Sequence, residues 1–163
     1  MNLTKNINSR VISTAFEAGK SVNLNGLYEL TKPRLSLLSV FTSSLGFLVH
    51  DPLIPDLGLF IALTLGTALS AGGAATLNQW IERKEDALMA RTASRPLPAK
   101  IVTPEVALGF GIALSILGLL TLWVWTNPWA TILTFTTLFI YLAIYTPLKK
   151  KSSIAIEVGA IAG

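Results

Sequence analysis

The longest uncharged stretch of the sequence constrains the fold more than any other feature. The segment Val106–Leu148 runs for 43 residues without a charged side chain. One helix of that length would be about 65 Å long, roughly twice the thickness of the hydrocarbon core of a bilayer. The stretch must therefore turn, and Thr126-Asn127-Pro128 contains the residue types that break helices. We expect two helices here, near residues 105–126 and 129–147.

Two shorter uncharged stretches, Leu35–His50 and Leu57–Ile81, come before it and predict spans near residues 30–50 and 57–81. A further apolar segment begins near Ser153 and continues to Gly163. Only 13% of the residues are charged and 52% are hydrophobic, whereas soluble domains carry roughly 25% charged residues. Disordered chains are polar and rich in charge. The sequence therefore predicts an all-α fold, a polytopic membrane helix bundle with four complete spans and the start of a fifth.

The basic residues predict the orientation of these spans. All 13 Lys and Arg residues fall before the first span, between the second and third spans, or between the fourth and fifth. Basic residues mark cytoplasmic loops, so we expect the N-terminus and the 82–104 loop to be cytoplasmic. Residues 1–25 lack the apolar core of a signal peptide and are predicted to form a cytoplasmic tail. Residues 26–163 then form the membrane domain.

Residue types that are rare in this chain exclude several kinds of chemistry. There is no cysteine and one histidine, which excludes thiol nucleophiles, disulfides and Cys-based zinc sites. His50 falls at the outer face in this topology, where an interfacial role is expected. Glu157 lies six residues after Lys151, and we expect its side chain to reach the interface.

Small residues recur along the predicted spans. Ala107, Gly111, Ser115 and Gly118 follow one another at spacings of four, four and three, a pattern that permits close helix contact. Gly72-Gly73 lies in a similarly small segment of the second span. Helix packing is the favoured interpretation, and room for a ligand beside the two glycines is the alternative.

The strongest candidate site lies where the second span meets the cytoplasmic face. Asn78, Glu82 and Asp86 are spaced four apart, so on a continuing helix they line one face, with neighbours about 6 Å apart. An amide and two carboxylates offer hard oxygen ligands. Mg²⁺ prefers this kind of site, with few protein carboxylates and with phosphate oxygens from a substrate.

Four basic residues sit close to this acidic face in the predicted topology. Arg91 and Arg95 follow it in the chain, and Lys32 and Arg34 lie at the same membrane face. Guanidinium groups bind phosphate in a bidentate manner, and Mg²⁺ would remove the repulsion between carboxylates and a diphosphate. An ordinary cytoplasmic loop would also explain the basic residues. It does not explain a polar stripe that continues directly from an uncharged helix.

At these residues the sequence resembles a known family. Asn78-x-x-x-Glu82-x-x-x-Asp86 followed by Arg91-Thr92-x-x-Arg95-Pro96-Leu97 resembles the first aspartate-rich motif of the UbiA-type intramembrane prenyltransferases, and more narrowly of the protohaem IX farnesyltransferases, or haem O synthases. Supporting segments extend the resemblance from about Tyr28 to Gly163: Glu29-Leu30-Thr31-Lys32-Pro33-Arg34, Gly72-Gly73-Ala74-Ala75 and Tyr145-Thr146-Pro147-Leu148-Lys149.

The resemblance implies an enzyme of a bacterial plasma (inner) membrane that transfers farnesyl from farnesyl diphosphate to haem b, giving haem O for terminal oxidases. It implies that Asn78, Glu82 and Asp86 hold the diphosphate through Mg²⁺. Arg91 and Arg95 would then neutralise the leaving diphosphate, assisted by Lys32 or Arg34. The bilayer is the other expected partner, and no nucleic acid is expected. Position 82 departs from many relatives, which have Asp there.

Two other interpretations stay open. One is a prenyltransferase for another acceptor, an aromatic acid or a chlorophyllide. The other is a transporter or structural membrane subunit. The resemblance also implies a bundle of about nine spans with a second acidic motif, but the only acidic residues after Asp86 are Glu105 and Glu157. We therefore expect this chain to be the N-terminal half of a longer protein, and to be inactive alone.

Overall fold

The computed structural model describes residues 23–50 and 56–149, and these residues are helical with connecting turns. A short helix, α2 (Leu24–Leu30), leads into α3 (Pro33–His50), and α4 (Leu57–Asp86) and α5 (Pro104–Trp125) follow. The last helical stretch is continuous but changes its winding, from α6 (Pro128–Phe139) through a π-helical segment, η1 (Ile140–Tyr145), to α7 (Thr146–Leu148). No strand occurs within this part of the chain. The prediction of an all-helical fold is confirmed.

Three helical segments are long and apolar enough to cross a membrane: Leu57–Asp86, Pro104–Trp125 and Pro128–Leu148. They correspond to the second, third and fourth expected spans. The first expected span differs, because its residues divide between α2 and the 18-residue α3, and α3 is not among the three. Because α3 is only 18 residues long, Pro33 and Arg34 at its start and His50 at its end fall within the length needed for a span. The fifth expected span, the 1–22 segment of the tail and Glu157 lie outside the described residues.

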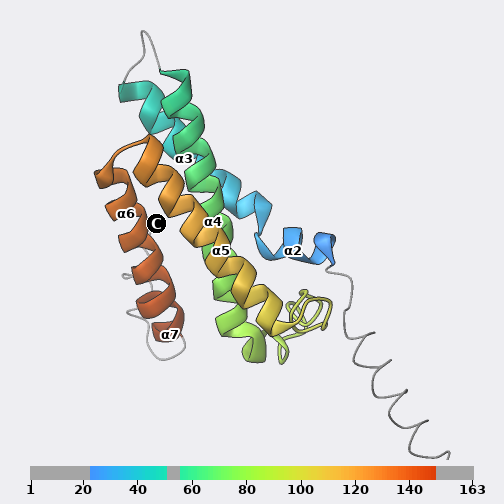
Figure 1. Cartoon of the computed structure of the whole chain (residues 1–163). Coiled ribbons are helices and arrows are strands. Elements are labelled where there is room, and N and C mark those ends of the chain that lie inside the picture. The colour runs from blue at the N-terminus through green and yellow to red at the C-terminus, as the bar shows by residue number, and fades with distance from the viewer. Residues whose placement is uncertain (1–22, 51–55, 150–163) are drawn as a thin grey trace, which may run out of the picture.

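The break predicted at Thr126-Asn127-Pro128 is present. Asn127 caps α6, since its side-chain oxygen accepts a hydrogen bond from the Ala130 amide at 2.8 Å, and Pro128 opens the helix. Proline is tolerated there because the first helical amides have no partner within the helix. The chain therefore reverses, and α5 and α6 lie side by side (Figure 1).

Close contact between α4 and α5 forms the centre of the bundle. A Cβ atom added at Gly73 would meet the Ser115 side chain and would lie 2.8 Å from the Ser115 amide nitrogen. One added at Gly118 would meet the Ser70 side chain and would lie 2.7 Å from the Ser70 amide nitrogen. The small-residue stripe of α5 thus makes the close helix contact that its pattern predicts, and its partner is α4. Only residues without large side chains permit this approach.

Helix α2 lies across the direction of the longer helices (Figure 1). Its Leu27 and Leu30 join a buried apolar cluster with Leu97, Val102 and Ala107, against which Trp80 and Phe110 pack. By contrast, α3 buries none of its residues. In a membrane protein such apolar surface faces lipid or further helices.

Candidate active site

The last turns of α4 carry a polar face that is buried. Asn78, Glu82 and Asp86 are 3%, 6% and 4% exposed. The helix continues past its apolar part to Asp86, so the spacing of four places all three side chains on one face, as predicted. Buried polar and charged groups must find partners to offset their desolvation, and each of the three does.

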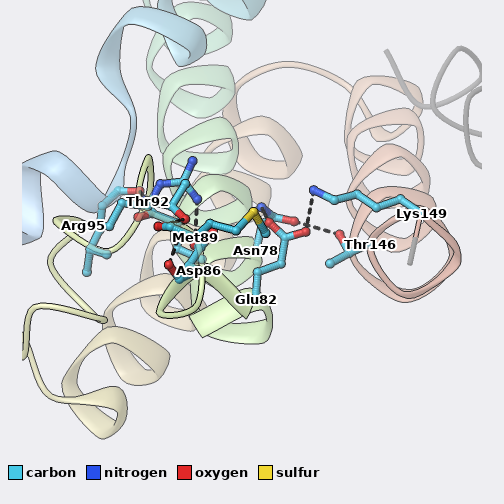
Figure 2. A network of polar contacts seen from close by, with 10 residues as sticks. Asn78, Glu82, Asp86, Met89, Thr92, Arg95, Thr146 and Lys149 are labelled. Carbon is cyan, nitrogen blue, oxygen red and sulfur yellow. Dashed lines mark hydrogen bonds and ion pairs between the residues drawn. The ribbon is translucent and has the colours of Figure 1, made fainter. Parts of the chain in front are cut away.

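Asn78 connects α4 to the end of the last helical stretch. Its side-chain Nδ2 donates to Glu82 Oε2 at 3.0 Å, and its Oδ1 lies 2.8 Å from the hydroxyl of Thr146, which can donate to it. The same hydroxyl also lies 2.8 Å from the Tyr141 carbonyl. Figure 2 shows that Asn78, Glu82 and Thr146 converge between the two helices.

Each carboxylate is paired with one cation. Lys149 Nζ lies 2.5 Å from Glu82 Oε1, and Arg95 Nη1 lies 2.6 Å from Asp86 Oδ2 (Figure 2). The two cations come from opposite sides of α4, Lys149 from the end of α7 and Arg95 from the loop after α4. The negative charge of the α4 face is thus compensated by two other parts of the chain.

The loop after α4 is ordered by Thr92. Its buried hydroxyl donates to the Asp86 carbonyl at 2.8 Å, which satisfies a helix-end acceptor that has no partner within the helix. The Arg95 amide in turn donates to the Thr92 carbonyl at 3.0 Å. This sequence of hydrogen bonds folds the loop back so that the Arg95 guanidinium meets Asp86.

The four basic residues predicted for this site separate into two groups. Arg95 and Lys32 lie within it, whereas Arg34 and Arg91 are exposed and form no ion pair among the residues with described positions. Burial lowers the pKa of the Lys32 ammonium from its ordinary value, and the positive charge of Arg95 lowers it further, while Glu82 and Asp86 oppose the shift. These charges are therefore close enough to Lys32 to act on it.

A cavity of about 830 Å³ lies between α3, α4 and α6, next to the polar site. Lys32, Tyr141 and Tyr145 line it near the site. Small or apolar residues form much of the remaining wall, together with hydroxyl side chains from all three helices: Ser36, Ser39, Ser43, Thr67, Ser70, Thr134 and Thr137. Its size and mostly apolar wall are typical of small-molecule sites.

The donor set fits Mg²⁺ only in company with a phosphate. No group of three or more His, Cys, Asp and Glu side chains that could hold a metal occurs in residues 23–50 and 56–149. Two carboxylates and an amide oxygen are present, and Mg²⁺ is commonly held by one or two carboxylates, waters and substrate phosphates. In the structure the side chains of Lys149 and Arg95 already form ion pairs with the two carboxylates, so this face attracts positive charge.

Sequence reasoning missed two residues of this site, Thr146 and Lys149. Both belong to the segment Tyr145-Thr146-Pro147-Leu148-Lys149, which contributed to the family resemblance without a role. The available signal was topological. Lys149 ends a span at the same predicted face as the 82–104 loop, so it was a candidate neighbour of the acidic face.

Fold and site together define a helical membrane protein with a charged site at one end of an apolar cavity. The model of the UbiA prenyltransferase family matches residues 39–163, and the chain belongs to this family. It is an integral membrane protein with helical spans. No solved structure matches the chain significantly.

Several curated relatives carry the name protoheme IX farnesyltransferase. The chain is 46% identical to the protein of that name from Opitutus terrae over 135 residues. This aligned region covers 83% of this chain and 45% of the relative. It is 38% identical over 156 residues to one from Shewanella oneidensis, covering 95% of this chain and 52% of the relative. The chain thus spans about half the length of the curated relatives it matches.

Proposed function

We propose that the protein to which this chain belongs transfers a farnesyl group from farnesyl diphosphate to haem b, giving haem O. The name shared by its relatives supports the reaction. The single structural observation that carries the proposal is the buried Asn78-Glu82-Asp86 face, with its cations, at one end of an apolar cavity of about 830 Å³. An ordinary charged loop would not bury its carboxylates.

The proposed chemistry begins with loss of diphosphate from an allylic carbon. The carbon–oxygen bond breaks, and the electron pair leaves with the diphosphate. The vinyl group of haem attacks the farnesyl cation, water captures the cation left on the neighbouring carbon, and a proton is released. Departure of the diphosphate needs stabilisation of its developing negative charge.

The residues of the site divide this work between them. Asn78, Glu82 and Asp86 would hold Mg²⁺, which supplies Lewis-acid stabilisation of the leaving oxygens when bound. Arg95 and Lys32 would contact the diphosphate directly, and Lys149, now paired with Glu82, adds a further cation. Arg91 and Arg34 are exposed and would meet the diphosphate or the acceptor from the open side. The cavity would keep water away from the farnesyl chain and from the farnesyl cation, whereas the later cation on the haem side chain must be reached by water.

The proposal includes the number of membrane spans and their orientation. We propose that α3 to α7 correspond to four complete spans, that a fifth begins near Ser153, and that the whole protein is a larger bundle of about nine spans. The N-terminus and the 82–104 loop would be cytoplasmic. Because the relatives are about twice as long, we expect no turnover from the 163-residue chain alone.

Product analysis tests the proposed reaction. The product of the complete reading frame that encodes this chain is purified in detergent and incubated with haem b, farnesyl diphosphate and Mg²⁺. Mass spectrometry should detect haem O, identified by the gain of a farnesyl group and a hydroxyl. A prenylated aromatic acid or chlorophyllide in parallel incubations, with haem b unchanged, would show that the acceptor is different.

A further inference from the structure

The turn that joins α2 to α3 has an unfavourable backbone conformation at Lys32, a residue that lines the cavity beside the site. Lys32 has a φ of 46°, in the left-handed region that residues with a Cβ rarely occupy. Pro33 follows directly and has no amide hydrogen to contribute. The turn has backbone hydrogen bonds of its own, from the amides of Lys32, Leu35 and Ser36, and side-chain contacts add to them.

One such contact comes from α4. The Gln79 side chain, 2% exposed, donates through Nε2 to the Leu30 carbonyl at 2.8 Å, a hydrogen bond between residues 49 positions apart. Leu30 itself is fully buried, and its carbonyl lies at the end of α2, where helical acceptors lack partners within the helix. Gln79 therefore joins the turn to the helix that carries Asn78.

A second contact lies within the turn. The Ser36 hydroxyl donates to the Thr31 carbonyl at 2.7 Å. Leu27 and Leu30 also anchor α2 in the apolar cluster beneath. Because α2 has this separate anchor, loss of the Gln79 hydrogen bond should loosen the turn without releasing the helix.

The residue held by this turn is part of the site. Lys32 lines the cavity, and the charges that act on it are those of Arg95, Glu82, Asp86 and Lys149. Gln79 is adjacent to Asn78 on α4 but points to a different neighbour. The same end of α4 thus carries the polar face and also supports the Lys32 ammonium opposite it.

We propose that Gln79 is a positioning residue, whose hydrogen bond to Leu30 holds the turn so that the Lys32 ammonium meets the diphosphate of the substrate. This inference rests on the proposed function. Gln79 itself touches no substrate in this scheme and acts only through the turn.

Steady-state kinetics on the product of the complete reading frame tests the proposal. The single variants are Gln79→Leu, Gln79→Met and Lys32→Met, and each Gln79 substitution is also combined with Lys32→Met. Loss of a hydrogen bond to a buried carbonyl should raise KM for farnesyl diphosphate about tenfold, with kcat within about twofold, since a binding contribution shared by ground and transition states changes KM alone. In the Lys32→Met background, either Gln79 substitution should change KM by less than about twofold, because coupled residues are not additive.

Thr76→Val is the matched control. Thr76 is a fully buried α4 residue whose hydroxyl donates to the Gly72 carbonyl of its own helix at 2.8 Å. The variant removes a buried hydrogen bond without touching the turn, so its KM should stay at the wild-type value. A general weakening of α4 would raise KM in this variant as well.

Hydrogen exchange supplies a readout that does not depend on activity. The amides of Lys32, Leu35 and Ser36 form the hydrogen bonds of the turn, so a peptide spanning residues 26–36 should exchange faster in the Gln79 variants than in Thr76→Val. Unchanged exchange, additive KM effects, or a loss confined to kcat would overturn the proposal. If the wild-type protein fails to use farnesyl diphosphate at all, the proposed function fails, whereas exchange still reports on the turn.

Discussion

Two carboxylates and three cations meet at the C-terminal end of α4, and their balance explains how a polar face can lie buried. Glu82 and Asp86 each have a cationic partner at 2.5 and 2.6 Å, and Lys32 is a third cation within their field. Buried ion pairs cost desolvation that their attraction only roughly repays. A site arranged this way therefore suggests function more than stability.

Asp86 is the residue whose change should be most informative. Asp86→Asn keeps the shape of the side chain and can still accept from Arg95, but it removes the negative charge that Mg²⁺ would need. We expect kcat/KM for farnesyl diphosphate to fall at least about 100-fold, the scale of losing one electrostatic stabiliser of the transition state. Steady-state kinetics on the product of the complete reading frame measures this.

Glu105→Gln is the control for that experiment, because Glu105 is an exposed carboxylate at the start of α5. It should leave the kinetics within about twofold, as surface charge changes away from a site usually do little. Normal turnover by Asp86→Asn would refute the assignment of this carboxylate to the diphosphate site.

At the scale of single residues, the sequence predicted the polar face and the nearby cations Arg95 and Lys32, but not the partners Thr146 and Lys149. The spacing of Asn78, Glu82 and Asp86 needs only helical periodicity, which local sequence carries. The contact between Asn78 and Thr146 joins residues 68 positions apart. It depends on the path of the intervening helices, which no local pattern specifies.

Among the helices, the contact between α4 and α5 is the closest. The stripe on α5 was visible in the sequence, since its period is helical, but its partner on α4 was not. Reciprocal contacts of Gly73 with Ser115, and of Gly118 with Ser70, bring the backbones together. Small side chains on both helices are therefore required at the same level.

Gly73→Ala should separate these two helices. The new methyl group would lie 2.8 Å from the Ser115 nitrogen and 2.9 Å from the Gly111 carbonyl, and backbone atoms cannot move aside cheaply. We expect a loss of about 1–3 kcal/mol in stability, typical of overpacking. Thermal denaturation of the detergent-solubilised protein, followed by loss of monodispersity, measures the shift.

Gly109→Ala is the matched variant, because a Cβ at this α5 glycine meets nothing within 4 Å. It should be neutral or slightly stabilising, since alanine is the better helix former. Equal destabilisation by both substitutions would contradict close packing at Gly73.

The π-helical segment η1 was not predicted. Pro147 explains its position, because proline cannot donate to the carbonyl four residues earlier and its ring clashes with that carbonyl. The altered winding carries Tyr141 and Tyr145, which line the cavity and stack with their ring centroids 5.7 Å apart. A single widened turn leaves no periodic signal in the sequence, so only the structure could show it.

At the scale of the whole molecule, most charged residues among 23–50 and 56–149 lie at one end of the bundle, which is also the end where the cavity approaches the polar face. These 163 residues contain no cysteine, so a single cysteine introduced among them has no native thiol of this chain to compete with. Two exposed positions suit a test of orientation, Ala99 on the loop after α4 and Trp129 near the start of α6, and each is replaced singly by cysteine (Ala99→Cys and Trp129→Cys). With the 82–104 loop cytoplasmic, an impermeant maleimide added to intact cells should label only Trp129→Cys.

Permeabilised cells provide the control for orientation, since both cysteines should then react. Labelling of Ala99→Cys alone in intact cells would show that the topology is the opposite of the proposed one. It would also place the charged site on the outer face, where the proposed function does not expect it.

The central claim is that the α4 polar face binds an isoprenoid diphosphate through Mg²⁺, and equilibrium binding of farnesyl diphosphate tests it most directly. The complete protein is titrated with the ligand in Mg²⁺ and again after EDTA treatment. We predict an affinity at least about tenfold weaker in EDTA, corresponding to about 1.4 kcal/mol, and a similar loss for Asp86→Asn in Mg²⁺. Equal affinity with and without the metal would contradict the claim.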